Sequence, residues 1–185
     1  MGKYDYLKKY INFDKFDGIR PYNWFEKVNS DSIAAAEKKL GFKFPNSLKE
    51  FWLEIGKGSL PNPVSYGEDY VGALNNHIFS PDEISDIMLL RENSDYILPE
   101  AVEYIEKGYI KDDDIIFFEI ADMSSFLVMK PSSDRPDAVY DEIGTLIEEH
   151  FEKFIWRLYY ESPNYYLPIQ LEAVNRMLDS TNQDS

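Results

Sequence analysis

Residues 33–52 read IAAAEKKLGFKFPNSLKEFW, a stretch that predicts two helices joined by a short extended link. In its first half, apolar side chains recur at helical spacing, and Gly41 is the type of residue that ends such a helix. Pro45 disfavours the helical conformation in the residue before it, so the link is extended. Ser47 and Glu50 have the spacing of a capping box, which begins the second helix. The stretch therefore predicts a helix pair with apolar faces turned to a core.

Signals for further helices lie on both sides of this stretch. Ser30 or Asp31 is placed to cap the first helix of the pair, and apolar spacing over residues 4–11 predicts a short opening helix. Segments 80–83 (SPDE) and 145–148 (TLIE) repeat the capping-box pattern, so each is expected to begin a helix.

Strand signals concentrate in the second half of the chain. Residues 115–120, 125–130 and 138–143 are short β-favouring runs separated by turn residues, which is typical of an antiparallel meander. Residues 70–79 are a further candidate strand, whereas the turn formers in 59–67 predict a loop.

The composition is that of a globular chain without cysteine. Hydrophobic residues make up 44% of the 185 residues and aromatic residues 16%, more than disordered segments contain. The length favours one domain, at roughly 150 residues per domain. Without cysteine, disulfides, thiol nucleophiles and cysteine-based metal sites are excluded, which fits a reducing compartment. Residues 1–6 carry charge where a signal peptide needs an apolar core, so we expect a soluble, cytoplasmic protein without membrane contact.

Negative charge is concentrated in the later part of the chain. There are 34 acidic and 19 basic residues, a net charge of −15. Residues 1–57 contain 11 basic and 8 acidic side chains, whereas residues 58–185 contain 8 basic and 26 acidic ones. Such a negative field repels phosphate backbones, so we do not expect direct nucleic-acid binding. We expect a basic protein partner instead. The same excess also maintains solubility, so composition leaves both roles open.

Taken together, four segments resemble the SUKH superfamily in sequence and in order. They are the helix pair of residues 33–52, the corner at 78–84 (IFSPDEI), the central strand at 114–118 (DIIFF) and the helix at 151–155 (FEKFI). The resemblance covers roughly residues 24–160.

This resemblance implies an α+β fold, a mainly antiparallel sheet with helices packed against it. We therefore expect residues 1–185 to form a single SUKH-like domain, with a helical extension over 1–23 and a C-terminal helix and tail over 163–185. Many members place a glycine in the turn between the two central strands. This chain has residues 121–125 (ADMSS) at that place and no glycine, so the turn is expected to be wider. The motif residues themselves have structural roles, so they identify the fold but not a functional site.

Catalytic and metal-binding chemistry has little support in the sequence. His77 and His150 are the two histidines, and neither has an orienting partner in a recognisable motif. Asp112, Asp113 and Asp114 suggest a hard-metal site, but calcium loops alternate their ligands and add a distal glutamate. We therefore expect no catalytic residue, no metal and no cofactor.

Two segments combine acidic side chains with aromatic ones, as protein interfaces do. Tyr66 and Tyr70 flank Glu68 and Asp69, and Tyr109 precedes the acidic run 112–114. The candidate partner-binding residues are Tyr66, Glu68, Asp69, Tyr70, Asp112, Asp113 and Asp114. The alternative is that these tyrosines pack on the core rim while the acids are solvated.

The resemblance also implies a function, because bacterial members are largely immunity proteins that neutralise toxins, often nucleases. We expect an immunity protein that binds a cognate, basic toxin and is itself a monomer or a weak homodimer. The alternatives are a regulatory protein-interaction module with an endogenous partner and an acidic hydrolase, which requires a bound divalent metal.

Overall fold

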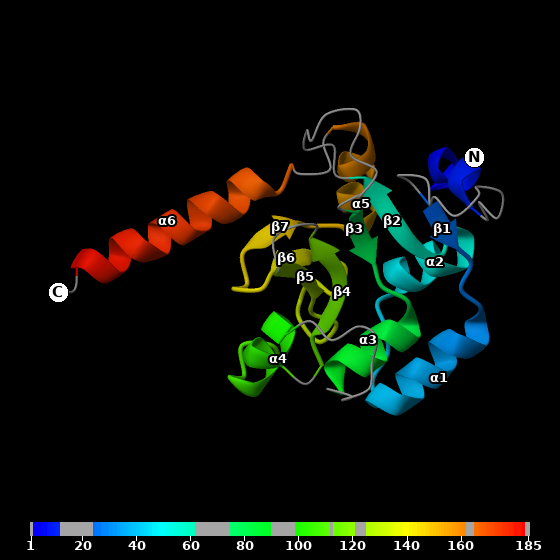
Figure 1. Ribbon diagram of the computed structural model, residues 1–185, viewed down its shortest axis with the longest axis horizontal. Helices are drawn as coiled ribbons and strands as arrows, with labels where there is room; N and C mark the ends of the chain where they lie inside the picture. The colour runs from blue at the N-terminus through cyan, green and yellow to red at the C-terminus, as the bar shows by residue number, and fades with distance from the viewer. Residues whose placement is uncertain are drawn as a thin grey trace.

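The computed structural model describes residues 2–11, 24–61, 75–89, 99–111, 113–120, 125–161 and 165–183. Within them, seven antiparallel strands form one sheet in chain order, with helices packed against it (Figure 1). The strands are β1 (Trp24–Glu26), β2 (Lys57–Pro61), β3 (Asn75–Ile78), β4 (Ile115–Ile120), β5 (Ser125–Met129), β6 (Val139–Asp141) and β7 (Leu146–Glu148). The helices are the 3-10 helix η1 (Asp5–Tyr10), α1 (Ser30–Leu40), α2 (Asn46–Glu54), α3 (Pro81–Met88), α4 (Pro99–Glu106), α5 (Phe151–Tyr160) and α6 (Leu167–Gln183). The α+β prediction is confirmed.

The helix pair of residues 33–52 is present as α1 and α2, and a buried carboxylate secures the link between them. Gly41 ends α1 with a φ of 82°, in the left-handed region that favours glycine. Glu37, 7% exposed, accepts a hydrogen bond from the backbone N–H of Phe44 at 3.1 Å. Its carboxylate also pairs with Lys43 at 2.6 Å and with Lys49 at 3.4 Å. Glu37 thus fixes the extended link on which the direction of α2 depends.

The capping predictions have mixed outcomes. Ser80 and Glu83 form the predicted reciprocal capping box at the start of α3. The cap of α1 is Asn29 instead of Ser30 or Asp31, because its side chain accepts a hydrogen bond from the Ser32 N–H at 2.8 Å. The box predicted at Ser47 is absent: α2 begins at Asn46, and Ser47 donates to Asp137 at 2.5 Å.

Two segments form a different class of element from the one that the sequence predicts. Residues 145–148, expected to begin a helix, lead into and form strand β7, in which Leu146 pairs with Tyr140 of β6. The helix begins only at Phe151, after His150. Residues 59–61, expected in a loop, are the end of β2, which pairs with β1 and β3.

Strand β4 lies at the centre of the core. A register shift between Ile116 and Phe118 leaves Phe117 as a bulge, and the extra residue lets both phenylalanines contact Phe154 of α5. Phe151 of α5 packs edge-on against Phe117 as well, at 5.6 Å between ring centroids. This bulge therefore sets how α5 sits on the sheet.

The N-terminal helix η1 is part of the same core. Tyr4 and Leu7 are completely buried, and the Tyr4 ring packs edge-on against Phe51 of α2 at 5.0 Å. Ile11 forms an isolated parallel bridge with Phe25 of β1. The described part of the predicted N-terminal extension is thus integrated into the domain.

Candidate protein-binding surface

Most of the site residues predicted from sequence lie outside the described part of the chain. Tyr66, Glu68, Asp69 and Tyr70 belong to segment 62–74, and Asp112 is likewise outside the described residues.

The other two predicted site residues, Asp113 and Asp114, are described. Asp113 is half-buried, and Asp114 is only 3% exposed. The Asp114 carboxylate accepts a hydrogen bond from the Lys111 N–H at 3.1 Å, and burial raises its pKa. Contrary to the sequence-based expectation of a partner-facing carboxylate, Asp114 holds the turn before β4.

The two predicted segments join the sheet at opposite ends. Segment 62–74 connects Pro61 of β2 to Asn75 of β3, which are paired at the end of the sheet where β4 finishes. Asp114 precedes Ile115, the first residue of β4. At about 3.3 Å per residue, the length of β4 separates these points by roughly 20 Å. The fold therefore does not bring the described ends of the two acidic segments together.

Several carboxylates of the acidic part of the chain are buried and have structural roles. Asp141, 2% exposed, accepts hydrogen bonds from the N–H groups of Ile143 and Thr145 and so shapes the turn between β6 and β7. Burial raises the pKa of Asp141 and of its neighbour Glu142. The acidic excess is therefore only partly a property of the surface.

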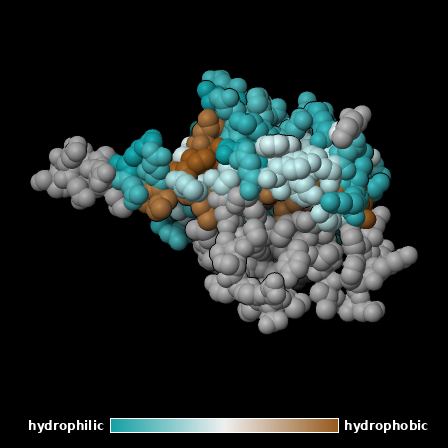
Figure 2. Space-filling view, turned by 90° about the horizontal axis from the view of Figure 1, so that it is seen from above, coloured by the Kyte–Doolittle hydropathy of each residue, from teal (hydrophilic) through white to brown (hydrophobic). Residues whose placement is uncertain are grey.

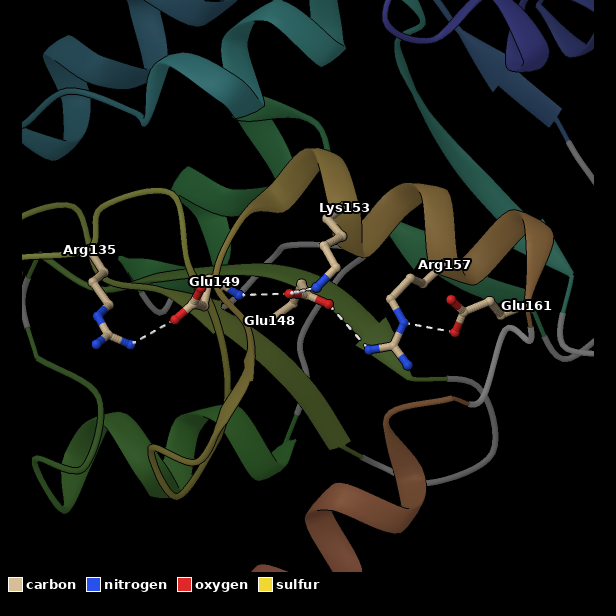
Figure 3. Close-up of polar contacts among 6 residues, drawn as sticks. All are labelled: Arg135, Glu148, Glu149, Lys153, Arg157 and Glu161. Atoms are coloured by element: carbon tan, nitrogen blue, oxygen red, sulfur yellow. Dashed lines mark hydrogen bonds and ion pairs between the residues drawn. The ribbon is translucent and has the colours of Figure 1, made fainter.

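Glu148 lies at the centre of a row of ion pairs that joins β7 to α5 (Figure 3). It is 5% exposed and pairs with Lys153 at 3.0 Å and with Arg157 at 3.2 Å. Burial alone raises the pKa of Glu148, but these two cations and the Glu149 N–H outweigh it, so the pKa is lowered. Arg157 also pairs with Glu161 at 2.8 Å, and its guanidinium lies 3.9 Å from the centroid of the Tyr165 ring. This row fixes α5 against the sheet, and Arg157 also holds the ring of Tyr165, just before α6.

Aromatic side chains from η1 and α5 form a continuous surface, which we call the aromatic patch. Its members are Tyr6, Tyr10, Trp156, Tyr159 and Tyr160. Neighbouring ring centroids lie between 4.8 and 6.3 Å apart. Trp156 is 45% exposed and Tyr160 is 54% exposed, so the patch presents large apolar faces to solvent. Tryptophan and tyrosine are the side chains most enriched at the energetic centres of protein interfaces.

A hollow of about 340 Å³ lies beside the aromatic patch. It is lined by Lys3, Tyr6, His150, Glu152, Lys153 and Trp156. The lysines are already paired, Lys3 with Glu50 and Glu152 and Lys153 with Glu148. With its charges balanced and two aromatic walls, the hollow suits a protein side chain better than a phosphate group.

The sequence alone does not reveal this surface, because its aromatic residues come from distant parts of the chain, whereas the predicted site combined aromatic and acidic residues that are close together in sequence. The patch combines residues 6–10 with residues 156–160, which only the fold brings together. One signal was available: Trp156 and Tyr160 are four residues apart, on a different face of α5 from the buried Phe154 and Leu158.

Ser59, His77 and Glu83 resemble a catalytic triad in order but are buried. His77 Nδ1 lies 3.4 Å from Ser59 Oγ, and His77 Nε2 lies 3.5 Å from Glu83. Ser59 is 2% exposed, so a substrate does not reach its hydroxyl.

Among the described residues, no group of three or more histidine, aspartate or glutamate side chains is placed to hold a metal ion, and no helix is long and apolar enough to cross a membrane.

Glu83 supports the fold electrostatically, and its loss is expected to be visible in pH dependence. Burial alone raises the pKa of Glu83, but the His77 ring, the Ser80 N–H and the Lys57 charge outweigh it and hold the pKa at about 2, against 4.5 ordinarily. Because the folded-state pKa is the lower one, the stabilisation is complete above about pH 4.5 and is lost as the pH falls through 2. Glu83→Gln should lower the free energy of unfolding at pH 7 by about 3 kcal/mol, with the loss shrinking below pH 4.5.

Denaturant unfolding at several pH values measures this loss, and the neighbouring Asp82 provides a control. The Asp82 side chain is 54% exposed and pairs with Lys39 at 3.3 Å, so Asp82→Asn should change stability by less than about 1 kcal/mol at every pH. An equal, pH-independent loss in both variants would show that the charge of Glu83 does not stabilise the fold.

Comparison with known proteins places this chain in a family. Residues 27–168 match the model of the SMI1 / KNR4 family (SUKH-1). A relative in Bacillus subtilis (strain 168), Immunity protein YxxD, is 29% identical over 149 residues, which cover 80% of this chain and 90% of the relative. The matched region begins just after β1 and includes every later element of the sheet and the start of α6. The chain belongs to the SMI1 / KNR4 family (SUKH-1).

Proposed function

We propose that this protein is an immunity protein that acts in the cytoplasm, binds a cognate protein toxin directly and neutralises it without catalysis. The observation that carries the proposal is the family membership together with the relative that bears the name Immunity protein YxxD. The alignment with that relative spans most of both chains, so it concerns the whole domain. The described surface supports a binding role, because its exposed aromatic side chains have the character of an interface.

We propose the aromatic patch as the main contact area. Burial of Trp156 and Tyr160 against a toxin removes large apolar faces from water and costs little side-chain entropy, since η1 and α5 already hold the rings in place. The hollow between Lys3 and Trp156 is a socket for one side chain of the partner. Such a preformed pocket beside exposed aromatic rings is typical of interface hot spots.

We propose further that the toxin is basic, as a nuclease that grips phosphate must be. The carboxylates of residues 58–185 then accelerate the approach of the toxin by Coulomb attraction. In electrostatically steered complexes the association rate constant reaches about 10⁸–10⁹ M⁻¹s⁻¹ at low salt. Glu68, Asp69, Asp112 and Asp113 are the side chains proposed for this role, with Tyr66 and Tyr70 as additional contacts. Asp114 has no part in this role because its carboxylate is buried.

Trp156→Ala and Tyr160→Ala are each expected to weaken toxin binding by about ten- to a hundredfold, the effect of truncating a hot-spot side chain. Titration calorimetry with a catalytically inactivated toxin measures the affinity. Leu89→Ala is the matched control, because Leu89 is 44% exposed at the end of α3 and lies outside the patch. Unchanged affinity in both aromatic variants would place the contact area elsewhere.

Reversal of charge at Glu68 and Asp69 tests the steering proposal separately. The double substitution to lysine should slow association about tenfold at low salt and flatten its salt dependence, while the dissociation rate changes less. Stopped-flow mixing at several ionic strengths measures the rate. The control is the same double reversal at Glu26 and Asp31, two exposed acids in the first part of the chain. Equal slowing by both pairs would mean that total charge alone governs association.

A further inference from the structure

The hollow beside the aromatic patch contains one carboxylate that its neighbours hold loosely. Both lysines that line the hollow are bonded to carboxylates outside it, Lys3 to Glu50 at 3.0 Å and Lys153 to Glu148 at 3.0 Å. Glu152 also lines the hollow, is about half exposed, and has the longer of the two contacts of Lys3, at 3.5 Å. Glu152 is therefore the charged group of the hollow that gains most from a further partner.

Aromatic side chains accompany this carboxylate. Tyr6 and Trp156 line the hollow together with Glu152, and Trp156 lies about one turn after Glu152 on α5. The Tyr6 hydroxyl is buried and has no hydrogen-bond partner among the residues that the structure describes. Seen from the side of η1 and α5, the surface has an area of intermediate hydropathy, the range of tyrosine and tryptophan, with hydrophilic residues around it (Figure 2). The hollow thus offers aromatic rings, a carboxylate and a hydroxyl oxygen.

The chain uses the same combination of ring and carboxylate to hold its own cations. The Arg157 guanidinium lies 3.9 Å from the centroid of the Tyr165 ring and is bonded to two carboxylates. On the aromatic patch itself, the Lys9 ammonium lies 4.9 Å from the centroid of the Tyr10 ring. Among the described cations, none lies over the Trp156 ring. A guanidinium is planar, so it stacks on a ring while its edge donates to a carboxylate.

We infer that the hollow receives an arginine side chain of the protein partner, whose guanidinium stacks on the Trp156 ring and pairs with Glu152. This assignment rests on the proposed function, because a toxin that grips phosphate presents cationic side chains at its surface. A guanidinium has five N–H donors, so it also donates to the Tyr6 hydroxyl oxygen. The volume of about 340 Å³ lies at the low end of the range for ligand pockets, about 300–1,000 Å³, and so suits one side chain.

Titration of the full chain with N-acetyl-arginine amide, followed by NMR, tests the inference without any toxin. The chain has three tryptophans, so its spectrum contains three indole N–H signals, and Trp156→Phe identifies the one that belongs to Trp156. We expect this signal to shift saturably, with a dissociation constant of about 1 mM, as is usual for so small a ligand. N-acetyl-lysine amide should bind more weakly because an ammonium does not stack, and N-acetyl-glutamate amide should cause no saturable shift.

Three variants separate a site for arginine from a site for an anion. Glu152→Gln should weaken binding of the arginine probe about two- to fivefold, the scale of one exposed ion pair. Lys3→Gln should strengthen it, because Glu152 loses a competing ammonium, whereas a site for an anion would lose affinity in this variant. The matched control is Glu149→Gln, since Glu149 is exposed and pairs with Arg135 instead of lining the hollow. All three side chains are about half exposed or more, so the domain remains folded, which circular dichroism checks.

Calorimetry with the inactivated toxin shows whether the partner uses this site. Glu152→Gln should weaken toxin binding about two- to tenfold, and Glu149→Gln should leave it unchanged. The inference is overturned if the arginine probe causes no saturable shift, if the glutamate probe binds more tightly, if Lys3→Gln weakens binding of the arginine probe, or if Glu152→Gln binds the toxin as tightly as the wild type. Each of these results leaves the proposed function standing. A wild type that does not bind the toxin at all would contradict the proposed function instead.

Discussion

Arg157→Gln is expected to lower the free energy of unfolding at pH 7 by about 3 kcal/mol, because it leaves the buried Glu148 carboxylate with one cation instead of two. Glu148 is 5% exposed in the folded chain, so its carboxylate depends on these two cations for charge compensation. The substitution also removes the contact of Arg157 with the Tyr165 ring at 3.9 Å. Removal of one partner of a buried ion pair costs about 3–5 kcal/mol, and Lys153 keeps the expected loss at the lower end of that range.

The matched control for this prediction is Arg135→Gln. Arg135 pairs with the adjacent glutamate, Glu149, at 3.6 Å, and both side chains are more than half exposed (Figure 3). An exposed pair contributes about 0–1 kcal/mol, so this variant should be nearly as stable as the wild type. Because the pKa of Glu148 is lowered in the fold, the loss in Arg157→Gln should shrink as the pH falls below the ordinary glutamate range. Similar losses in the two variants, or a pH-independent difference, would contradict the role of Glu148.

Gly56→Ala should be at least as damaging, with a loss of about 3 kcal/mol or more. Gly56 joins α2 to β2 and has a φ of 118°, a backbone angle that residues with a side chain rarely adopt. A Cβ at this position overlaps the carbonyl oxygen of Glu26, at the end of β1. Strain and overlap therefore add, and the first strand pair of the sheet must shift to make room.

Gly41→Ala separates these two causes. Gly41 also has a positive φ, 82°, but a Cβ there meets no atom of the described residues within 4 Å. Its loss should be limited to backbone strain, about 1–2 kcal/mol. Thermal and denaturant unfolding of both variants measure the difference. Equal losses would mean that the close approach of β1 to Gly56 adds nothing to the cost of a side chain there.

The sequence locates helices well where local chemistry decides them, although the cap of α1 is Asn29 and not Ser30 or Asp31. It fails where strand pairing decides the element. Residues 80–83 and 145–148 have the same capping-box pattern, but only the first begins a helix. In the second, Leu146 pairs with Tyr140, and Glu148 is paired with the cations of α5 and caps nothing. Those partners lie in other elements, so a local pattern does not contain them. Similarly, Ser47 bonds to Asp137, 90 residues away in the chain.

The candidate site was less predictable than the fold. Composition correctly gives the acidic excess, but it does not reveal that Asp114, Asp141 and Glu148 are buried within the fold. The aromatic patch joins the first and the last third of the chain, so no window of sequence contains it. Tyr66, Glu68, Asp69, Tyr70 and Asp112 lie outside the described residues and stay predictions.

Neutralisation of a toxin by direct binding is the proposed function of this protein. The most direct measurement is survival of a host that co-expresses the chain with the toxin encoded beside its gene in the producing genome. We expect full protection by the wild type and reduced protection by Trp156→Ala at matched protein levels. Death of the host as fast with the protein as without it, together with capture of only housekeeping proteins from the producing cell, would contradict immunity and favour a regulatory interaction module instead.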